Sequence, residues 1–116
     1  MRFLVLLASE DHFDRWDNAT EELRERSIAD YNAFADAVRQ RGTLIVGDAL
    51  GRPETAQSLR PGPARSVTRG PFAETVEQIG GFYVVDLPDV DTAVEVAALL
   101  PRECTIEVRP ALGVTV

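Results

Sequence analysis

The sequence predicts an α+β protein with a ferredoxin-like sandwich, in which two β-α-β units place both helices on one face of a four-stranded antiparallel sheet. Residues 3–7 form a continuous apolar run, which is typical of a strand covered on both faces. Two segments with helical periodicity each lie between strand patterns, and a Gly- and Pro-rich insertion separates the two units. At 116 residues and 12.7 kDa, we expect a single domain over residues 1–116 with the strand order 4-1-3-2.

The first unit continues from that strand through a polar loop into a helix. Asn18 or Thr20 can cap the helix at its start. Apolar residues recur at the 3.6-residue period as far as about Arg41, and Gly42 stands where a left-handed C-terminal cap belongs. Thr43–Gly47 then predicts the second strand.

The insertion after the second strand predicts turns and a hairpin. Glycine and proline are dense over residues 51–63. Residues 58–60 and 64–68 can pair around Pro61-Gly62-Pro63, although the prolines restrict such a pair to an edge feature.

The second unit predicts a strand, a helix and a final strand. Gly81–Asp86 is the third main strand. Asp89 or Asp91 caps a helix that runs through Leu100, where the following proline stops it. Residues 105–109 alternate strictly between polar and apolar side chains, as in a strand with one buried face.

The charge balance excludes several kinds of partner. A net charge of -7 and a pI near 4.6 argue against nucleic acid, because phosphate binding needs clustered cations, and they disfavour an anionic membrane surface. No apolar run approaches the ~20 residues of a membrane-spanning helix, and the N-terminus does not match a signal peptide. We expect a cytoplasmic protein.

The residue inventory also limits the chemistry. All 12 basic residues are arginine, so no lysine is available for a Schiff base or a P-loop. His12 is the only histidine, which excludes multi-histidine metal sites. The lone Cys104 predicts a buried reduced thiol. We expect no metal and no other cofactor.

The most informative segment of the chain is Gly70–Tyr83. A Gly-Pro break opens it and two consecutive glycines lead into the third strand. Between them lie Glu74, Glu77 and Gln78, with a spacing that neither a regular helix nor a strand explains. This polar cluster predicts a functional site.

Glu74 is the first candidate within that cluster. If Phe72 and Trp16 partly desolvate its carboxylate, its pKa rises and it can act as a base or acid. A nearby Arg69 or Arg109 would instead lower that pKa and favour anion binding. The structural alternative is that Glu74 caps local backbone and holds the loop against the sheet.

Three further residues are candidates near the first strand and helix. His12 lies in the loop after the first strand, where adjacent carboxylates can raise its pKa towards that of a useful base; the alternative is a solvated loop. Trp16 is either an apolar wall of a cleft or a cover for the core. Tyr31 lies on the buried stripe of the helix, where it packs in the core or shows its hydroxyl to a pocket.

These candidates predict where a ligand would bind. We expect the site between the loop at residues 10–17 and the segment at residues 70–81, with Glu74 and Trp16 lining it. We expect the first and third strands to run parallel, and on that basis we place the end of the first strand beside the start of the third.

The segment from Gly70 to Tyr83 resembles the D-G-P-F-A-E-T-K-E-Q-x-G-G-[FY]-Y motif of DGPF domain proteins, a branch of the YCII-related superfamily, and the similarity extends over nearly the whole chain. The resemblance implies a homodimer of the dimeric α/β-barrel type. Arg69 departs from the family pattern, because it occupies the place of the aspartate. Some YCII proteins are thought to use a His-Asp dyad, whose places are taken here by Tyr31 and Gln40.

Assembly is also expected from the strand composition. Two helices cannot cover both faces of the predicted strands, and large exposed apolar patches are rare on monomers. The apolar residues of these strands are Phe3, Val5, Leu7, Ile106 and Val108. We therefore expect a homodimer that covers the helix-free face.

Two classes of function remain open. One is a small-molecule-binding or regulatory homodimer, and the resemblance to DGPF proteins implies association with a sigma factor as a regulatory protein partner. The other is a cofactor-independent isomerase, dehydratase or lyase that uses Glu74 or His12 for proton transfer. The absent dyad and single histidine favour the first, whereas the loop and superfamily chemistry favour the second.

Overall fold

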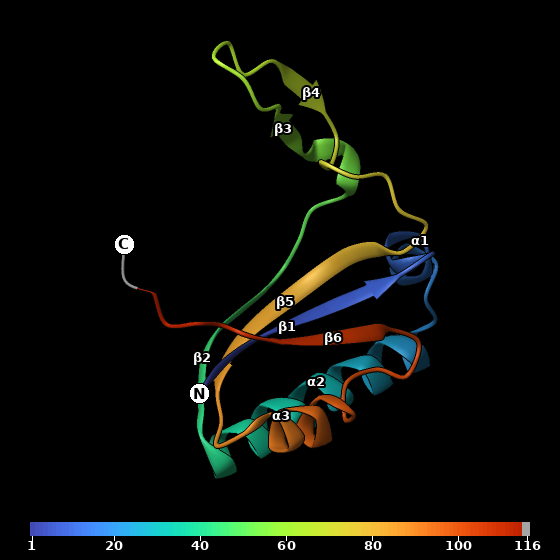
Figure 1. Cartoon of the computed structure of the whole chain (residues 1–116). Coiled ribbons are helices and arrows are strands. Elements are labelled where there is room, and N and C mark those ends of the chain that lie inside the picture. Colours follow the sequence, from blue (N-terminus) through green and yellow to red (C-terminus); the bar gives the residue numbers. More distant parts are fainter. Residues whose placement is uncertain (115–116) are drawn as a thin grey trace.

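The protein is built from one layer of antiparallel strands with two longer helices packed on the same side (Figure 1). The structure is a computed structural model that describes residues 1–114. Its elements along the chain are β1 (Arg2–Ser9), α1 (His12–Asp17), α2 (Glu21–Arg41), β2 (Thr43–Ala49), the short 3-10 helix η1 (Pro53–Thr55), β3 (Gln57–Leu59), β4 (Val67–Arg69), β5 (Gln78–Asp86), α3 (Val90–Ala97) and β6 (Thr105–Pro110).

The main sheet has the order β2-β5-β1-β6, and each neighbouring pair is antiparallel. The mixed α+β class is confirmed, and the arrangement is consistent with a ferredoxin-like fold. The expectation that the first and third strands run parallel is wrong. Ser9 at the end of β1 pairs with Gln78 at the start of β5, because antiparallel neighbours bring the end of one strand to the start of the other.

The core lies between the sheet and helices α2 and α3. Alternate side chains of β1 are completely or almost completely buried there: Phe3, Val5 and Leu7. Phe34 and Val38 of α2 pack into the same cluster, with apolar residues of α3. Each such side chain contributes about 1.5–3 kcal/mol when it is fully removed from water.

The opposite face of the sheet has no helix over it in the described chain (Figure 1). Strand pairing puts Leu4 beside Val84 and Leu6 beside Phe82 on this face, and all four are half-buried. We call these four residues the open face. Ile106 and Val108 instead pair with Leu7 and Val5 on the helix side, where they pack against the core.

Of the two predicted caps of α2, the one at the start of the helix is confirmed and the one at its end is wrong. The Thr20 hydroxyl accepts a hydrogen bond from the backbone N–H of Leu23 at 3.1 Å, which caps the helix as predicted. Gly42 is not left-handed, since its φ of -176° is extended. Glycine is needed there because a Cβ would lie 1.9 Å from the carbonyl oxygen of Asp86.

Helix α3 ends earlier than the sequence suggests. Asp89 caps it by accepting a hydrogen bond from the backbone N–H of Thr92 at 2.8 Å. The last regular helical residue is Ala97, and not Leu100. The N–H groups of Leu99 and Leu100 donate to carbonyls only three residues back, a tighter turn that often ends a helix.

The segment after β1 is a short helix, α1, where the sequence suggested a loop. Arg15 holds it in place: its guanidinium pairs with Asp11 one turn earlier, and its Nη2 donates to the Ser9 hydroxyl at 3.2 Å. The same Nη2 lies 3.8 Å from the Cys104 sulfur on the loop before β6. Residues 9–17 contain neither glycine nor proline, so helical backbone is accessible to them.

Strands β3 and β4 form a separate hairpin that projects from the body of the protein (Figure 1). The sequence-predicted hairpin is confirmed, with Gln57 opposite Arg69 and Leu59 opposite Val67. The turn between the strands includes Gly62, whose φ of 124° favours glycine. Throughout the described chain, every helix is too short or too polar to cross a bilayer.

Candidate ligand-binding cavity

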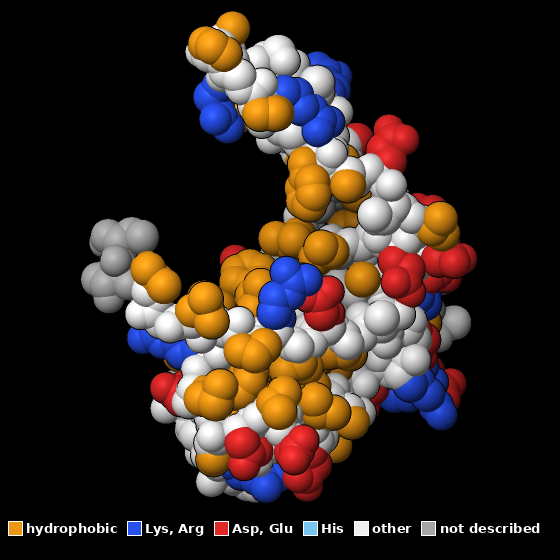
Figure 2. Space-filling view, in the orientation of Figure 1, with side chains coloured by type: hydrophobic (Ala, Val, Ile, Leu, Met, Phe, Trp, Pro, Cys, Tyr) orange, Lys and Arg blue, Asp and Glu red, His pale blue; other side chains and the backbone are white. Residues whose placement is uncertain are grey.

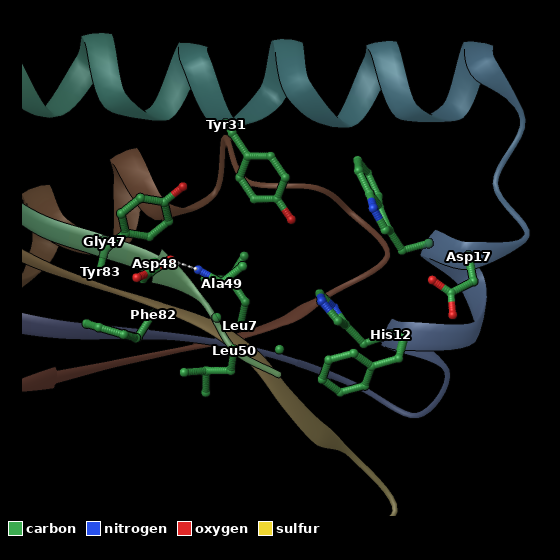
Figure 3. A pocket seen from close by; sticks show the side chains of 14 residues that line it. Leu7, His12, Asp17, Tyr31, Gly47, Asp48, Ala49, Leu50, Phe82 and Tyr83 are labelled. Carbon is green, nitrogen blue, oxygen red and sulfur yellow. Dashed lines mark hydrogen bonds between the residues drawn. The ribbon is translucent and has the colours of Figure 1, made fainter. Parts of the chain in front are cut away.

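A cavity of about 520 Å³ lies where α1 and α2 meet the ends of β2 and β5 (Figure 3). This volume falls in the range of about 300–1,000 Å³ that is typical of small-molecule sites. Most of its lining is apolar or aromatic, and its wall residues come from both faces of the sheet beside the edge strand β2. The lining residues are Leu7, His12, Phe13, Trp16, Asp17, Tyr31, Gly47, Asp48, Ala49, Leu50, Gly80, Gly81, Phe82 and Tyr83.

His12 is held in the cavity wall by packing. Its ring lies so close to Gly80 that a Cβ on that residue would come within 2.1 Å of the imidazole Nε2. The Phe13 ring meets it edge-on, with 5.0 Å between ring centroids. Among residues 1–114, His12 Nδ1 is the only buried side-chain nitrogen or oxygen without a hydrogen-bond partner. Burial of an unpartnered nitrogen is costly, so His12 is held at this position at the expense of stability.

The surroundings of His12 keep its ring neutral near pH 7. Burial lowers the pKa of the imidazole below 6.5, and the positive charge of Arg15 lowers it further. Asp11 acts in the opposite direction and only partly offsets these effects. This result is contrary to the raised pKa that the sequence suggested, because burial of the ring and the charge of Arg15 together outweigh the effect of Asp11. A neutral imidazole can accept a hydrogen bond or a proton.

Two tyrosines form the wall on the helix side. Tyr31 extends from α2 towards the space that His12 enters from α1 (Figure 3). Burial raises the pKa of Tyr31 to about 12, so its hydroxyl is a neutral donor or acceptor. The Tyr83 ring packs on Phe34 at 4.7 Å between centroids and lies across Gly47, where a Cβ would come within 2.3 Å of it.

The charged groups of the lining are carboxylates. Asp17 forms an ion pair with Arg52, which also reaches Asp14 at 3.3 Å. Asp48 accepts a hydrogen bond from the backbone N–H of Ala49 at 2.9 Å. No arginine of the described residues lines the cavity. Over the same residues, no group of three or more His, Cys, Asp or Glu side chains is arranged to hold a metal ion.

The structure brings together some of the sequence-predicted site residues. His12, Trp16 and Tyr31 all line the cavity. Glu74 does not line it and is exposed to solvent, as is Phe72. The predicted catalytic role of Glu74 therefore has no support from this cavity and stays a prediction.

The remaining predicted residues lie elsewhere on the surface. Glu77 accepts a hydrogen bond from the Thr105 hydroxyl at 2.6 Å, and Gln78 opens β5 opposite Ser9. Arg69 lies on the hairpin, and Arg109 lies on β6 in an ion pair with Glu107. None of these four lines the cavity, so their predicted ligand contacts also stay predictions.

Sequence reasoning missed several wall residues, among them Phe13, Asp48 and Tyr83. Gly47 was the available signal, because an isolated glycine inside a strand pattern often marks a close approach. Here the close approach is that of the Tyr83 ring. The neighbour of Gly47, Asp48, could then have been placed beside the same wall.

Comparison of the sequence with known proteins gives matches over most of the chain. An uncharacterised protein of Rhizobium meliloti (strain 1021) is 33% identical over 96 residues, which cover 78% of this chain and 77% of that protein. A family model of the YCII-related domain matches residues 1–110, a range that contains every residue of the cavity. The chain therefore belongs to the YCII-related domain family.

Proposed function

We propose that this protein binds a small organic molecule in the cavity between α1, α2 and the ends of β2 and β5. The observation that carries the proposal is His12, a neutral imidazole with an unpartnered buried nitrogen in the wall of a mostly apolar cavity. The His12 imidazole can form a hydrogen bond with a ligand in the cavity, and Tyr31 offers a second neutral polar group. Apolar walls with a few polar groups that fix orientation are characteristic of ligand sites.

A thermal-shift screen of small metabolites tests this proposal. Ligands that bind only the folded protein raise its melting temperature by mass action. We expect hits that stabilise the wild type and lose their effect in His12→Leu. Glu25→Gln, an exposed change on the outer surface of α2, is the matched control and should keep them. Hits that stabilise His12→Leu equally would contradict the proposed site.

The assembly that we propose is a homodimer in which the open faces of two copies pack together as a dimeric barrel. Leu4, Leu6, Phe82 and Val84 form an apolar surface that no helix of the described chain covers. Hydrophobic side chains are visible on the sheet below the hairpin in Figure 2. Symmetric pairing of one patch with its copy is the commonest way to bury such a surface.

Light scattering tests the homodimer. The wild type should have about twice the chain mass of 12.7 kDa, and Val84→Arg should reduce it to the mass of one chain. Val94→Arg, on the exposed outer side of α3, should leave the assembly unchanged. A wild type with the mass of one chain at micromolar concentration would contradict the proposal.

Proton transfer is the second candidate function, because His12 and Tyr31 bring an imidazole and a neutral hydroxyl to the wall of one cavity. The imidazole would take a proton from a bound carbon or oxygen acid and return it to another position, while the Tyr31 hydroxyl donates to the anion formed. Exchange of carbon-bound ligand protons for deuterium in D₂O, followed by NMR, tests this for each screening hit. Turnover requires exchange with the wild type that disappears in His12→Leu, whereas binding alone requires none.

A further inference from the structure

We propose that the cavity selects organic cations, meaning small amines or ammonium compounds with an apolar or aromatic body. This inference rests on the proposed function and names the class of ligand that the same site would take. The geometry that carries it is an aromatic enclosure with carboxylates, and no arginine, in its wall.

The aromatic part of the wall is extensive. Five rings besides the imidazole line the cavity: Phe13, Trp16, Tyr31, Phe82 and Tyr83. The face of an aromatic ring carries negative electrostatic potential and attracts cations. Two of these rings already hold a guanidinium on one face, since Arg24 lies 5.5 Å from the centroid of Trp16 and Arg52 lies 5.7 Å from that of Phe13.

The charges of the lining favour the same sign of ligand. Arg52 neutralises Asp17 by direct pairing, but no ion pair joins Asp48 to any arginine within residues 1–114. Asp48 pairs with Phe82 across the strands, so its solvent-exposed and uncompensated carboxylate lies on the Phe82 side of the cavity, at the edge of the sheet (Figure 3). The net charge of -7 adds a long-range attraction for cations.

An anionic ligand would meet the opposite situation. It would leave water for a wall with no arginine and with one unpaired carboxylate, and burial of an unpaired charge is unfavourable. Arg15, on the far side of His12, is already engaged by Asp11, Ser9 and Cys104. Its guanidinium is thus not available as a counter-charge.

Three probes of the same size test this inference: benzylamine, benzyl alcohol and benzoate. Trp16 is the only tryptophan of the chain and lines the cavity, so its fluorescence reports binding of each probe to the full-length protein. At pH 8 and low salt, benzylamine should bind about tenfold more tightly than benzyl alcohol. Benzoate should bind more weakly than benzyl alcohol.

The substitution Asp48→Asn tests whether the Asp48 carboxylate contributes to the preference for benzylamine. It should weaken the binding of benzylamine, so that only the part of the preference that the aromatic rings supply is left, and it should leave the affinity for benzyl alcohol unaffected. Asp36→Asn, which removes the same charge from an exposed position on α2, should keep the preference. An unchanged preference in Asp48→Asn would overturn the assignment of this carboxylate as a source of the preference.

The failures of this inference and of the proposed function are distinguishable. Equal binding of benzylamine and benzyl alcohol, or tighter binding of benzoate, overturns the cation preference while the cavity stays a ligand site. No change in Trp16 fluorescence and no NMR shift at the cavity with any of the three probes at 50 mM concentration, on the order of a weak fragment's Kd, counts against the proposed function itself.

Discussion

Helix α1 and the segment from Pro71 to Glu77 lead to the same end of the sheet, yet they differ in almost every physical respect. Helix α1 is fastened by Arg15 and places His12 in a cavity wall. The segment has Phe72 80% exposed and Val76 72% exposed, with Glu74 also in solvent. Its described contacts are few, such as a hydrogen bond from Arg60 to the carbonyl of Phe72 at 2.9 Å.

The difference teaches how a polar residue becomes a candidate for function. The segment has the denser group of carboxylates, but these side chains are exposed to solvent. His12 is a single polar residue on a packed element, and the pocket around it both lowers its pKa and leaves Nδ1 without a partner. Rigid support and partial burial of a side chain are therefore better indicators of a functional residue than the number of polar residues in a segment.

The largest effect that we expect comes from Gly80→Ala. The new Cβ would overlap the imidazole of His12 at 2.1 Å, so the ring must shift from its place in the cavity wall. Overpacking of this kind costs about 1–3 kcal/mol, and ligand binding should be lost with it. Urea denaturation measures the first effect and thermal shift the second.

Gly51→Ala is the control for that substitution. Its Cβ would meet only the side-chain oxygen of Thr55, at 3.0 Å, so it should change stability by less than about 0.5 kcal/mol. Equal tolerance of the two changes would show that the contact between Gly80 and His12 is not fixed.

Replacement of His12 itself should separate stability from binding. In His12→Leu the buried Nδ1 disappears, so stability should stay the same or rise by about 1 kcal/mol. Affinity for any cavity ligand should fall at least about tenfold, as expected for loss of a hydrogen bond worth about 1.4 kcal/mol. Retained affinity, measured by calorimetry, would place the ligand elsewhere.

The stability of the protein should depend on pH through protonation of the His12 imidazole. The unfolded chain protonates His12 near pH 6.5, whereas the folded protein holds this pKa lower, so the unfolded state binds more protons between the two values. Stability contributed by neutral His12 is therefore complete above pH 6.5 and declines as the pH falls below it. The loss should be under about 1 kcal/mol, because the ring is only half-buried and solvent screens its interactions.

The measurement is the free energy of unfolding at pH 7.5 and 5.5 for the wild type and for His12→Leu. Carboxylates affect both proteins alike, so the difference between them isolates His12. A wild type that gains stability relative to His12→Leu on acidification would show that the pKa shift has the opposite sign.

The smallest effect that we expect comes from a substitution in the segment from Pro71 to Glu77. Glu74→Gln changes an exposed side chain without a described hydrogen bond, so stability should change by less than about 0.5 kcal/mol. On the observed geometry, ligand affinity should not change. If it falls as far as in His12→Leu, the segment from Pro71 to Glu77 contributes to the site, as the sequence predicts.

Local patterns in the sequence were sufficient for most of the fold. The apolar run of β1, the Thr20 cap and the hairpin depend on neighbours close in sequence, and each is present in the structure. The end of α3 was misplaced because the change to a tighter turn before Leu100 has no strong sequence signal.

The site was only partly predictable. His12 and Trp16 attracted interest as the only residues of their types, and Tyr31 as a polar tip on an apolar stripe. Tyr83 and Asp48 reach the cavity through the pairing of β2 with β5, in which Gly47 faces Tyr83. Register between strands distant in sequence cannot be read from either strand alone.

A crystal structure of the protein soaked with a hit from the metabolite screen tests the central claim most directly. The account predicts density for the ligand between His12 and Tyr31, with a hydrogen bond to the His12 imidazole and the Trp16 ring at its side. Density only beside the Pro71 to Glu77 segment, or only on the open face of the sheet, with the cavity unchanged, would contradict it.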